Sequence, residues 1–386
     1  MTLTVDRPVR RPRGRSVLLE IAERRRADLT AELAGTTLRE LGRAAAAASD
    51  PRPVALRLAR PGLHVIAEIK RRSPSAGSLA DGPLDVADRA RAYAAGGASM
   101  ISVLVEPHWF GGSIGDLVAA RGATSIPVLA KEFVVDPRQL PILRAAGADA
   151  VLLLAALHPA ARLARLVRRA LDLGLEPLVE VHDARELDAA LSTDARLIGV
   201  NNRDLRTLAV DTTTAEKLRT SIPHDRIVIA ESGVRQPALL RRWRALGFDA
   251  ALIGEDLMRA GTDAAAVSAR VAAFVSAGAV PRPGQDPATD GRQPLVKICG
   301  VTEPRGLTAA VAAGADAIGL NMVPGTKRAL SEPEVEALIR LARLTTSPGN
   351  GPKLVGIFAD RDASEVATIA ARLGLDAVQL HGSESP

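Results

Sequence analysis

HVIAEIKRRSPSAG, residues 64–77, is an apolar run that ends in three basic residues and a Ser-Pro-Ser turn. Seven more apolar runs follow it, and alanine- and arginine-rich stretches with helical periodicity separate them. These runs are ASMISVLVE (98–106), SIPVLAKEF (125–133), ADAVLLLAA (148–156), EPLVEVH (176–182), ARLIGVNN (195–202), DRIVIAESG (225–233) and FDAALIGED (248–256). Strands that are apolar throughout and alternate with helices indicate a parallel sheet buried on both faces. Eight such units predict an α/β fold, a (β/α)8 TIM barrel.

Nearly every run ends in a charged or amide side chain. Because active sites of such barrels lie at the carboxyl ends of the strands, function is sought at Lys70, Lys131, Glu180, Asn201 and Glu231. Each of these residues could be structural. With Glu68 of the first strand, two lysines and three acids lie on one face of the barrel, which is hard to explain as solvated surface, so the pattern favours a catalytic site.

The first strand adds Glu68, which points to the same face as Lys70 because the two residues are two apart. A charge pair that faces into a barrel mouth is costly unless it takes part in the reaction or a ligand neutralises it, so this pair favours a functional role. The alternative interpretation is an exposed salt bridge at the end of the strand. Lys131 ends the third strand, where burial is expected to lower its pKa and let it serve as an acid.

Phosphate binding has its own pattern in such barrels, in the loops after strands seven and eight. Here those loops read ESGV, with Gly233, and LIGEDL, with Gly254. Glycine lets backbone N–H groups approach phosphate oxygens closely. Glycine also ends strands for ordinary turn reasons, but its presence in both loops favours a phosphate ester.

Composition sets limits on the class of protein. One cysteine among 386 residues excludes an intrachain disulfide, no apolar run is long enough to span a bilayer, and no signal peptide opens the chain. We therefore expect a cytoplasmic enzyme with no membrane partner. The net charge of +6 owes much to arginines in residues 1–15, predicted to be a disordered basic tail. With 2% aromatic residues there is no stacking pattern for nucleic acid.

The domain organisation follows from the same patterns. Residues 16–34, with Ser16 as N-cap, and 36–48 are predicted helices that pack on the barrel, so that the barrel domain spans 16–277. Residues 278–293 are predicted to be a linker rich in Pro, Gly, Asp and Ala. Four further strand patterns then lie within 294–386: PLVKICGV (294–301), ADAIGLNMV (315–323), PKLVGIFAD (352–360) and LDAVQLHG (375–382). Four strands predict half a β/α barrel with open edges. Its apolar inner face has no partner, so we expect it to be poorly packed or mobile.

The motifs AEIKRRSPSAG, SVLVEPHWFGGS, VLAKEFVVDP, LVEVHDARELDAA, IGVNNRDLRTL, AESGV and ALIGEDLM resemble those of indole-3-glycerol phosphate synthases of tryptophan biosynthesis, in family order, over residues 16–277. VKICGVTE, GLNMVPGTKRALS, VGIFAD and DAVQLHG resemble the N-terminal half of phosphoribosylanthranilate isomerases. The first resemblance implies that 1-(2-carboxyphenylamino)-1-deoxyribulose 5-phosphate is converted to indole-3-glycerol phosphate with loss of CO2 and water.

The synthase resemblance also implies a role for each matching residue. Lys131 is the expected acid, Lys70 the cation that holds the substrate carboxylate, and Glu180 the general base, while Glu68 positions Lys70. The expected substrate-binding residues are Asn201, Glu231 and Ser232 for hydroxyls and charges, Phe110, Phe133 and Leu152 for the aromatic ring, and Ser73, Arg203, Gly233 and Gly254 for phosphate. Glu255 stands where many family members have serine, so its side chain is expected to turn away from the phosphate. The mechanism requires no cofactor, and no cluster of residues has metal-ligand spacing.

The isomerase resemblance implies Cys299 as general base, Arg328 as a substrate contact and His381 at the fourth strand end. A buried structural cysteine is the alternative for Cys299. The isomerase also needs an aspartic acid and phosphate loops from the other half of its barrel, so we expect residues 294–386 to be inactive. Two alternatives to the synthase stay open: another sugar-phosphate barrel enzyme, and a non-catalytic barrel scaffold. The sequence leaves the oligomeric state open.

Overall fold

The computed structural model describes residues 16–79, 84–205, 207–279, 296–346 and 351–383. The chain divides into two compact units, Met1–Pro283 and Gly284–Pro386, which are taken separately below. The predicted tail, 1–15, and nearly all of the predicted linker, 278–293, lie outside the described residues. Among the described helices, none combines the length and apolar character needed to cross a membrane.

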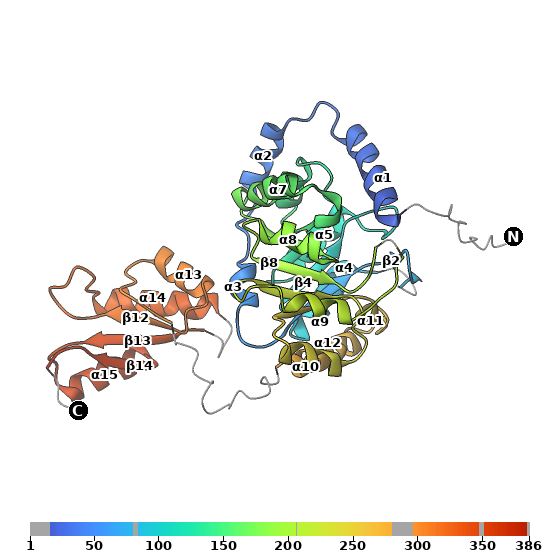
Figure 1. Cartoon of the computed structure of the whole chain (residues 1–386). Coiled ribbons are helices and arrows are strands. Elements are labelled where there is room, and N and C mark those ends of the chain that lie inside the picture. Colours follow the sequence, from blue (N-terminus) through green and yellow to red (C-terminus); the bar gives the residue numbers. More distant parts are fainter. Residues whose placement is uncertain (1–15, 80–83, 206, 280–295, 347–350, 384–386) are drawn as a thin grey trace. The chain divides into compact units, whose positions relative to one another are not determined.

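The first unit contains a closed barrel of eight parallel strands, which confirms the predicted fold (Figure 1). Its strands are β1 (His64–Ile69), β4 (Met100–Leu104), β5 (Val128–Lys131), β6 (Ala150–Leu154), β7 (Glu176–Val181), β8 (Leu197–Asn201), β9 (Ile227–Glu231) and β10 (Ala250–Ile253). The barrel closes because β1 pairs with β4 on one side and with β10 on the other.

Helices surround the barrel, as Figure 1 shows. They are α4 (Val86–Ala95), α5 (Ile114–Ala123), α6 (Gln139–Ala145), the 3-10 turn η1 (Ala155–Leu157), α7 (Ala160–Asp172), α8 (Ala184–Leu191), α9 (Thr213–Arg219), α10 (Pro237–Ala245), α11 (Glu255–Met258) and α12 (Ala264–Gly278). The strands are apolar throughout because both faces are covered. Along β1, Val65, Ala67 and Ile69 belong to the core under the helices, whereas Ile66 belongs to the core inside the barrel.

Three helices precede the barrel: α1 (Val17–Glu32), α2 (Leu38–Ala47) and α3 (Val54–Leu58). Ser16 occupies the N-cap of α1, as predicted, but its side chain makes no capping hydrogen bond. The apolar side of α1, with Val17, Leu18 and Ile21, joins the core inside the barrel. Helix α3, which the sequence did not reveal, joins the same core through Leu58. The first two helices therefore form the N-terminal extension expected from the sequence, and α3 adds a third element.

The segment after β1 was predicted to be a simple loop. It contains a short antiparallel hairpin of β2 (Arg72–Ser73) and β3 (Gly77–Ser78), and the Ser-Pro-Ser turn lies within it. The Ser73 hydroxyl accepts a hydrogen bond from the Ala76 N–H at 3.1 Å, which closes the turn. The hairpin places this turn beside the carboxyl end of the barrel.

The second unit contains a separate four-stranded parallel sheet, in the order β11-β12-β13-β14, with three helices. Its elements are β11 (Lys297–Cys299), α13 (Pro304–Ala312), β12 (Ala317–Asn321), α14 (Glu332–Thr345), β13 (Lys353–Phe358), α15 (Ala363–Leu373) and β14 (Ala377–Leu380). The sequence led us to expect poor packing here. Instead, Ile318, Leu320 and Phe358 are fully buried in a core with the helices, while Val378 and Leu380 on β14 are exposed.

Candidate active site

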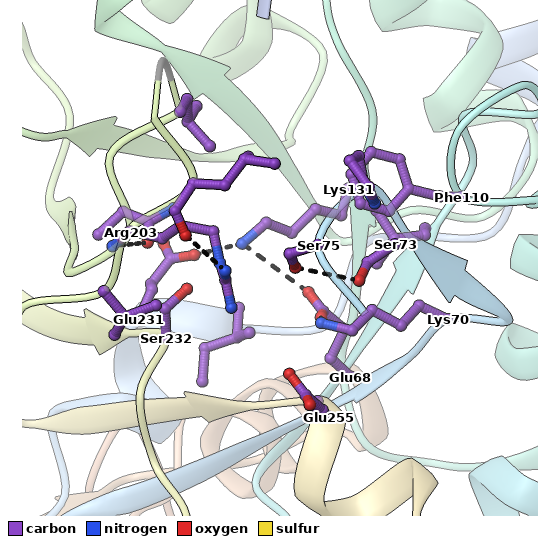
Figure 2. A pocket seen from close by; sticks show the side chains of 18 of the residues that line it. Glu68, Lys70, Ser73, Ser75, Phe110, Lys131, Arg203, Glu231, Ser232 and Glu255 are labelled. Carbon is purple, nitrogen blue, oxygen red and sulfur yellow. Dashed lines mark hydrogen bonds and ion pairs between the residues drawn. The ribbon is translucent and has the colours of Figure 1, made fainter. Parts of the chain in front are cut away.

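A cavity of about 600 Å³ opens at the carboxyl ends of the barrel strands. All fourteen residues that the sequence suggested for the synthase site line it, and Figure 2 shows several of their side chains facing one another. They are Glu68, Lys70, Ser73, Phe110, Lys131, Phe133, Leu152, Glu180, Asn201, Arg203, Glu231, Ser232, Gly233 and Gly254. Residues that lie up to 186 positions apart in the chain therefore meet in one place because each lies in a barrel strand or in the loop after it.

Lys131 lies at the centre of the charged group. Its ammonium forms ion pairs with the carboxylates of Glu231 and, at 3.9 Å, of Glu68 (Figure 2). A third ion pair joins it to Glu180 at 3.4 Å. All three glutamates are almost fully buried and come from different strands, β9, β7 and β1. One ammonium is thus shared by three buried carboxylates.

This arrangement contradicts the expected lowering of the pKa of Lys131. Burial by itself lowers the pKa of the lysine, but the negative charges of Glu231, Glu180 and Glu68 outweigh burial and raise it. The expectation was wrong because burial was considered without the three acids that share the site. Lys131 is therefore held firmly in its ammonium form.

The pKa values of Glu231 and Glu180 shift in different directions. Burial and the neighbouring charge of Glu180 raise the pKa of Glu231, more than Lys131 can lower it. For Glu180 burial also raises the pKa, but Lys131, His182 and Asn201 together lower it below its ordinary value. Burial and neighbouring charges thus shift the pKa values of two acids that contact the same ammonium in opposite directions. In active sites this pattern separates the general acid from the general base.

Glu68 and Lys70 form a second ion pair, with Lys70 Nζ 2.6 Å from Glu68 Oε1. Gly254 packs against this pair. A Cβ at position 254 would lie 2.4 Å from Glu68 Oε1 and 2.9 Å from Lys70 Nζ, so any side chain there would displace them. Other residues can also adopt its φ of −123°, so backbone conformation does not explain the glycine. Gly254 is needed because a side chain would not fit beside the ion pair, independently of any contact between its N–H and a phosphate.

Asn201 connects Glu180 to the next loop. Its Nδ2 donates to Glu180 Oε1 at 2.8 Å, and its Oδ1 accepts from the backbone N–H of Arg203 at 2.9 Å. The Arg203 guanidinium donates to the Leu208 carbonyl at 2.9 Å, so the loop after β8 folds back over the cavity. Asn201 therefore fixes the orientation of Glu180.

One wall of the cavity is apolar. The rings of Phe110 and Phe133 stack with their centroids 6.0 Å apart, and Leu152 lies in the same core cluster. The buried Glu106 carboxylate accepts hydrogen bonds from three successive backbone N–H groups, those of residues 108–110, and so holds the loop that carries Phe110. Helix α1 completes this wall with Val17, Leu18 and Ile21. Their spacing predicted an amphipathic helix but not this place at the cavity.

The opposite end of the cavity is formed by the loops after β9 and β10. Ser232 and Gly233 have φ of 66° and 87°, and a Cβ on Gly233 would lie 2.7 Å from the Thr212 methyl group. Both residues therefore have left-handed backbone conformations, and the chain turns sharply at this end of the cavity. Glu255 was expected to turn away. It lines the cavity instead and pairs with Arg259 at 3.4 Å.

Sequence reasoning missed one further group, the pair His182 and Glu186. His182 Nε2 lies 3.4 Å from Glu180 Oε1, and His182 Nδ1 lies 3.0 Å from Glu186 Oε2. The signal was present in LVEVHD, because His182 follows Glu180 by two residues and shares its side of the strand.

In the second unit the three isomerase-like residues lie near the carboxyl ends of the sheet. Cys299 is exposed, which removes the alternative of a buried structural cysteine. Arg328 packs over Gly300, where a Cβ would lie 2.4 Å from its Cδ. His381 follows β14, and its Nδ1 lies 3.4 Å from the Gln379 amide.

Comparisons with known proteins separate the same two regions. Residues 18–269 match the family model described as indole-3-glycerol phosphate synthase. Residues 296–386 match the model described as N-(5'phosphoribosyl)anthranilate (PRA) isomerase.

Three relatives illustrate the similarity of the first region. The indole-3-glycerol phosphate synthase of Mycobacterium avium (strain 104) is 48% identical over 258 residues, which are 67% of this chain and 94% of that protein. Indole-3-glycerol phosphate synthase 2 of Streptomyces coelicolor is 51% identical over 217 residues, 56% of this chain and 84% of that protein. The synthase of Mycobacterium tuberculosis (strain ATCC 25177 / H37Ra) is 46% identical over 258 residues, 67% of this chain and 94% of that protein.

Proposed function

We propose, from the premise that this chain belongs to the indole-3-glycerol phosphate synthase family, a set of roles for the residues of the barrel cavity. The reaction of tryptophan biosynthesis converts 1-(2-carboxyphenylamino)-1-deoxyribulose 5-phosphate to indole-3-glycerol phosphate, CO2 and water. It is a decarboxylating ring closure, and thus a carbon–carbon lyase reaction. The observation that supports these roles best is the shared ammonium of Lys131 beside a stacked aromatic wall.

Binding comes first. The phenyl ring of the substrate packs against Phe110, Phe133 and Leu152. Its carboxylate pairs with Lys70, which Glu68 holds in place at 2.6 Å. The phosphate occupies the other end of the cavity, near the backbone of Ser232 and Gly233 and the side chains of Ser73 and Arg203. The substrate is stretched between these two ends, so its reacting centre lies beside Lys131.

Ring closure needs a proton on the ribulose C2 oxygen as the aromatic carbon attacks that centre. Lys131 donates it. The raised pKa of Lys131 does not prevent this step, because an alkoxide is a far stronger base than the three carboxylates that hold the ammonium. Until transfer, the charge of Lys131 stabilises the developing oxyanion. The new ring then loses CO2, and the carboxylate leaves its contact with Lys70.

Dehydration completes the indole. Glu180 removes the proton from the carbon next to the one that carries the hydroxyl, and its lowered pKa keeps it ionised for that role. The hydroxyl leaves as water with a proton from Lys70, and the two carbons form the double bond of the indole. Glu231, whose pKa is raised, keeps a proton near neutral pH and can hydrogen bond to a substrate hydroxyl. Asn201 orients Glu180 through the 2.8 Å hydrogen bond.

Paired variants test the division of roles between the two lysines. Lys131→Met is expected to lower kcat at least tenfold, which is about 1.4 kcal/mol, while substrate still binds, because an acid acts on charge that develops in the transition state. Lys70→Met is expected to raise KM as well, because its partner carboxylate is already charged in the bound substrate. Steady-state kinetics followed by indole fluorescence would distinguish them. A Lys131→Met enzyme that keeps more than about a tenth of kcat would remove Lys131 from the acid role.

A further inference from the structure

Behind the cavity, Glu180 is in contact with a histidine that does not line the cavity. The two oxygens of Glu180 have different partners: Oε2 faces Lys131 at 3.4 Å, while Oε1 accepts from Asn201 at 2.8 Å and lies 3.4 Å from His182 Nε2. His182 follows the last residue of β7, and its side chain is only 13% exposed. It therefore lies beside the Glu180 oxygen that Lys131 does not pair with.

His182 is itself fixed by Glu186, on the first turn of α8. One oxygen of Glu186, Oε2, accepts both the backbone N–H of His182 at 2.9 Å and the ring Nδ1 at 3.0 Å. Asp183 caps the N-terminus of α8 by accepting a hydrogen bond from the Glu186 N–H at 2.9 Å, which fixes the backbone position of Glu186. The ring of His182 is thus held with Nδ1 toward Glu186 and Nε2 toward Glu180.

The titratable groups that act on this ring are three acids. They come from Glu180 on β7, Glu186 on α8 and Glu231 on β9. Burial lowers the pKa of His182, but these three acids outweigh burial and raise it, so that the cationic form is favoured. In return, the imidazolium is one of the charges that lower the pKa of Glu180.

We propose that His182 is a positioning residue for Glu180: clamped by Glu186, its imidazolium holds the Glu180 carboxylate in the ionised form and orientation that a general base needs. The inference rests on the proposed role of Glu180 as base. Without His182, Glu180 would be a buried acid beside Glu231 and Glu68, kept charged by the neutral amide of Asn201 and by the ammonium of Lys131, which all three acids share.

The test is the pH dependence of kcat in the full chain, compared among His182→Gln, Glu186→Gln and wild type. A base must be deprotonated, and loss of the imidazolium makes Glu180 easier to protonate. The acid limb of the profile therefore moves to higher pH. We expect kcat of His182→Gln to fall about tenfold at the acid end and less than about twofold at the alkaline end, where Glu180 is ionised in any case. Glu186→Gln is expected to move the limb in the same direction, but less.

A matched control is His64→Asn. His64 is another partly buried histidine of the barrel, bonded to Ser99 at 2.9 Å and to the Arg60 carbonyl at 3.0 Å, at the start of β1. Its substitution is expected to leave the profile unmoved. A uniform loss of kcat in His182→Gln, with the acid limb unchanged, would overturn the inference, because it would show a structural role only.

Two further measurements keep the test decisive. If His182→Gln does not fold, the imidazole of His182 can be titrated by nitrogen-15 NMR in wild type and Glu186→Gln; an unchanged titration would overturn the proposed clamp. Glu180→Gln separates this inference from the function on which it rests. If Glu180→Gln keeps wild-type kcat, the base role itself fails; if it is inactive while the His182→Gln profile is unmoved, only the inference fails.

Discussion

At the scale of single residues, the site depends on an excess of buried negative charge. Three carboxylates face the ammonium groups of Lys131 and Lys70. Such a cluster is costly to bury, and the cost is reduced when one acid keeps its proton, as the raised pKa of Glu231 indicates. Among the three acids, Glu231 is therefore the one expected to hold a proton, while Glu180 stays ionised.

Gly254 offers a residue-scale prediction that removes no charged group. Gly254→Ala adds one methyl group within 2.4 Å of Glu68 Oε1 at a φ that alanine accepts. We expect it to displace the Glu68–Lys70 pair and lower kcat/KM at least about tenfold, with the melting temperature nearly unchanged. Steady-state kinetics and thermal unfolding measure the two effects.

The matched control is Gly122→Ala on α5, where a Cβ meets nothing within 4 Å. It is expected to keep wild-type kinetics and to gain up to about 1 kcal/mol of stability from helix propensity. Wild-type kcat/KM in Gly254→Ala would show that the position of the Glu68–Lys70 pair is unimportant for turnover.

The sequence predicted where these residues lie in the fold, but it did not predict their protonation states. The position of Lys70, Lys131, Glu180 and Glu231 at strand ends follows from chain order and barrel geometry, both of which can be read from apolar periodicity. The direction of the pKa shift of Lys131 could not be predicted, because it depends on which acids from other strands lie close to the Lys131 ammonium. The spatial role of Gly254 depends on side-chain packing in the same way.

At the scale of elements, helix α1 is tied to the barrel by a buried ion pair. Arg25 on α1 donates to Glu132 Oε2 at 3.1 Å, and Glu132 directly follows the catalytic candidate Lys131. Burial raises the pKa of Glu132 to about 7, despite the opposing charge of Arg25 and the hydrogen bond from the Phe133 N–H. The contact between α1 and β5 therefore includes a carboxyl group that is costly to ionise.

This carboxyl group gives the stability of the barrel unit a pH dependence with a defined sign. An acid whose pKa is higher in the folded than in the unfolded state stabilises below the unfolded pKa, and that stability is lost as pH rises toward the folded pKa. Glutamine does not ionise, so the Glu132→Gln variant does not lose this stability as the pH rises. Its free energy of unfolding relative to wild type is therefore expected to rise by roughly 2–3 kcal/mol from pH 5 to pH 8.

Urea unfolding at the two pH values measures this difference. Both tryptophans, Trp109 and Trp243, lie in the barrel unit, so fluorescence reports its unfolding. Asp172→Asn, an exposed position at the end of α7, is the control and is expected to follow wild type at both pH values. A constant difference between Glu132→Gln and wild type would contradict the raised pKa of Glu132.

Elements were predictable where periodicity was strong. All eight barrel strands lie inside the apolar runs, but each is shorter than its run, because the residues that follow enter the loops that line the cavity; β5, for example, ends at Lys131 within the run 125–133. Helix α3 and the hairpin β2–β3 escaped prediction because five residues and two residues are too short to show a period.

At the scale of the whole molecule, the synthase site is contained within one unit. Every residue that lines the cavity lies between 17 and 259. The barrel nevertheless needs the end of α12, because the Gly278 carbonyl accepts from the Leu63 N–H at 2.9 Å just before β1. Cutting after residue 277 would remove this contact, so the unit boundary at Pro283 is the better place.

Residues 1–283 alone are therefore expected to turn over the synthase substrate with a kcat within about twofold of the full chain, since no step draws on residues beyond them. Neither polypeptide is expected to isomerise phosphoribosylanthranilate. The second unit offers Cys299 as a base on four described strands, whereas a proton shift needs an opposing acid as well. Parallel assays of both polypeptides with both substrates measure this. Isomerase turnover by the 386-residue polypeptide would contradict the second expectation.

The central claim is tested most directly by incubating the full chain with 1-(2-carboxyphenylamino)-1-deoxyribulose 5-phosphate and measuring indole fluorescence and released CO2 together. The roles proposed for Lys131, Lys70 and Glu180 predict one CO2 for each indole-3-glycerol phosphate, and loss of both signals in Lys131→Met. A folded protein that binds this substrate but yields neither product would contradict the account, as would CO2 release without indole formation.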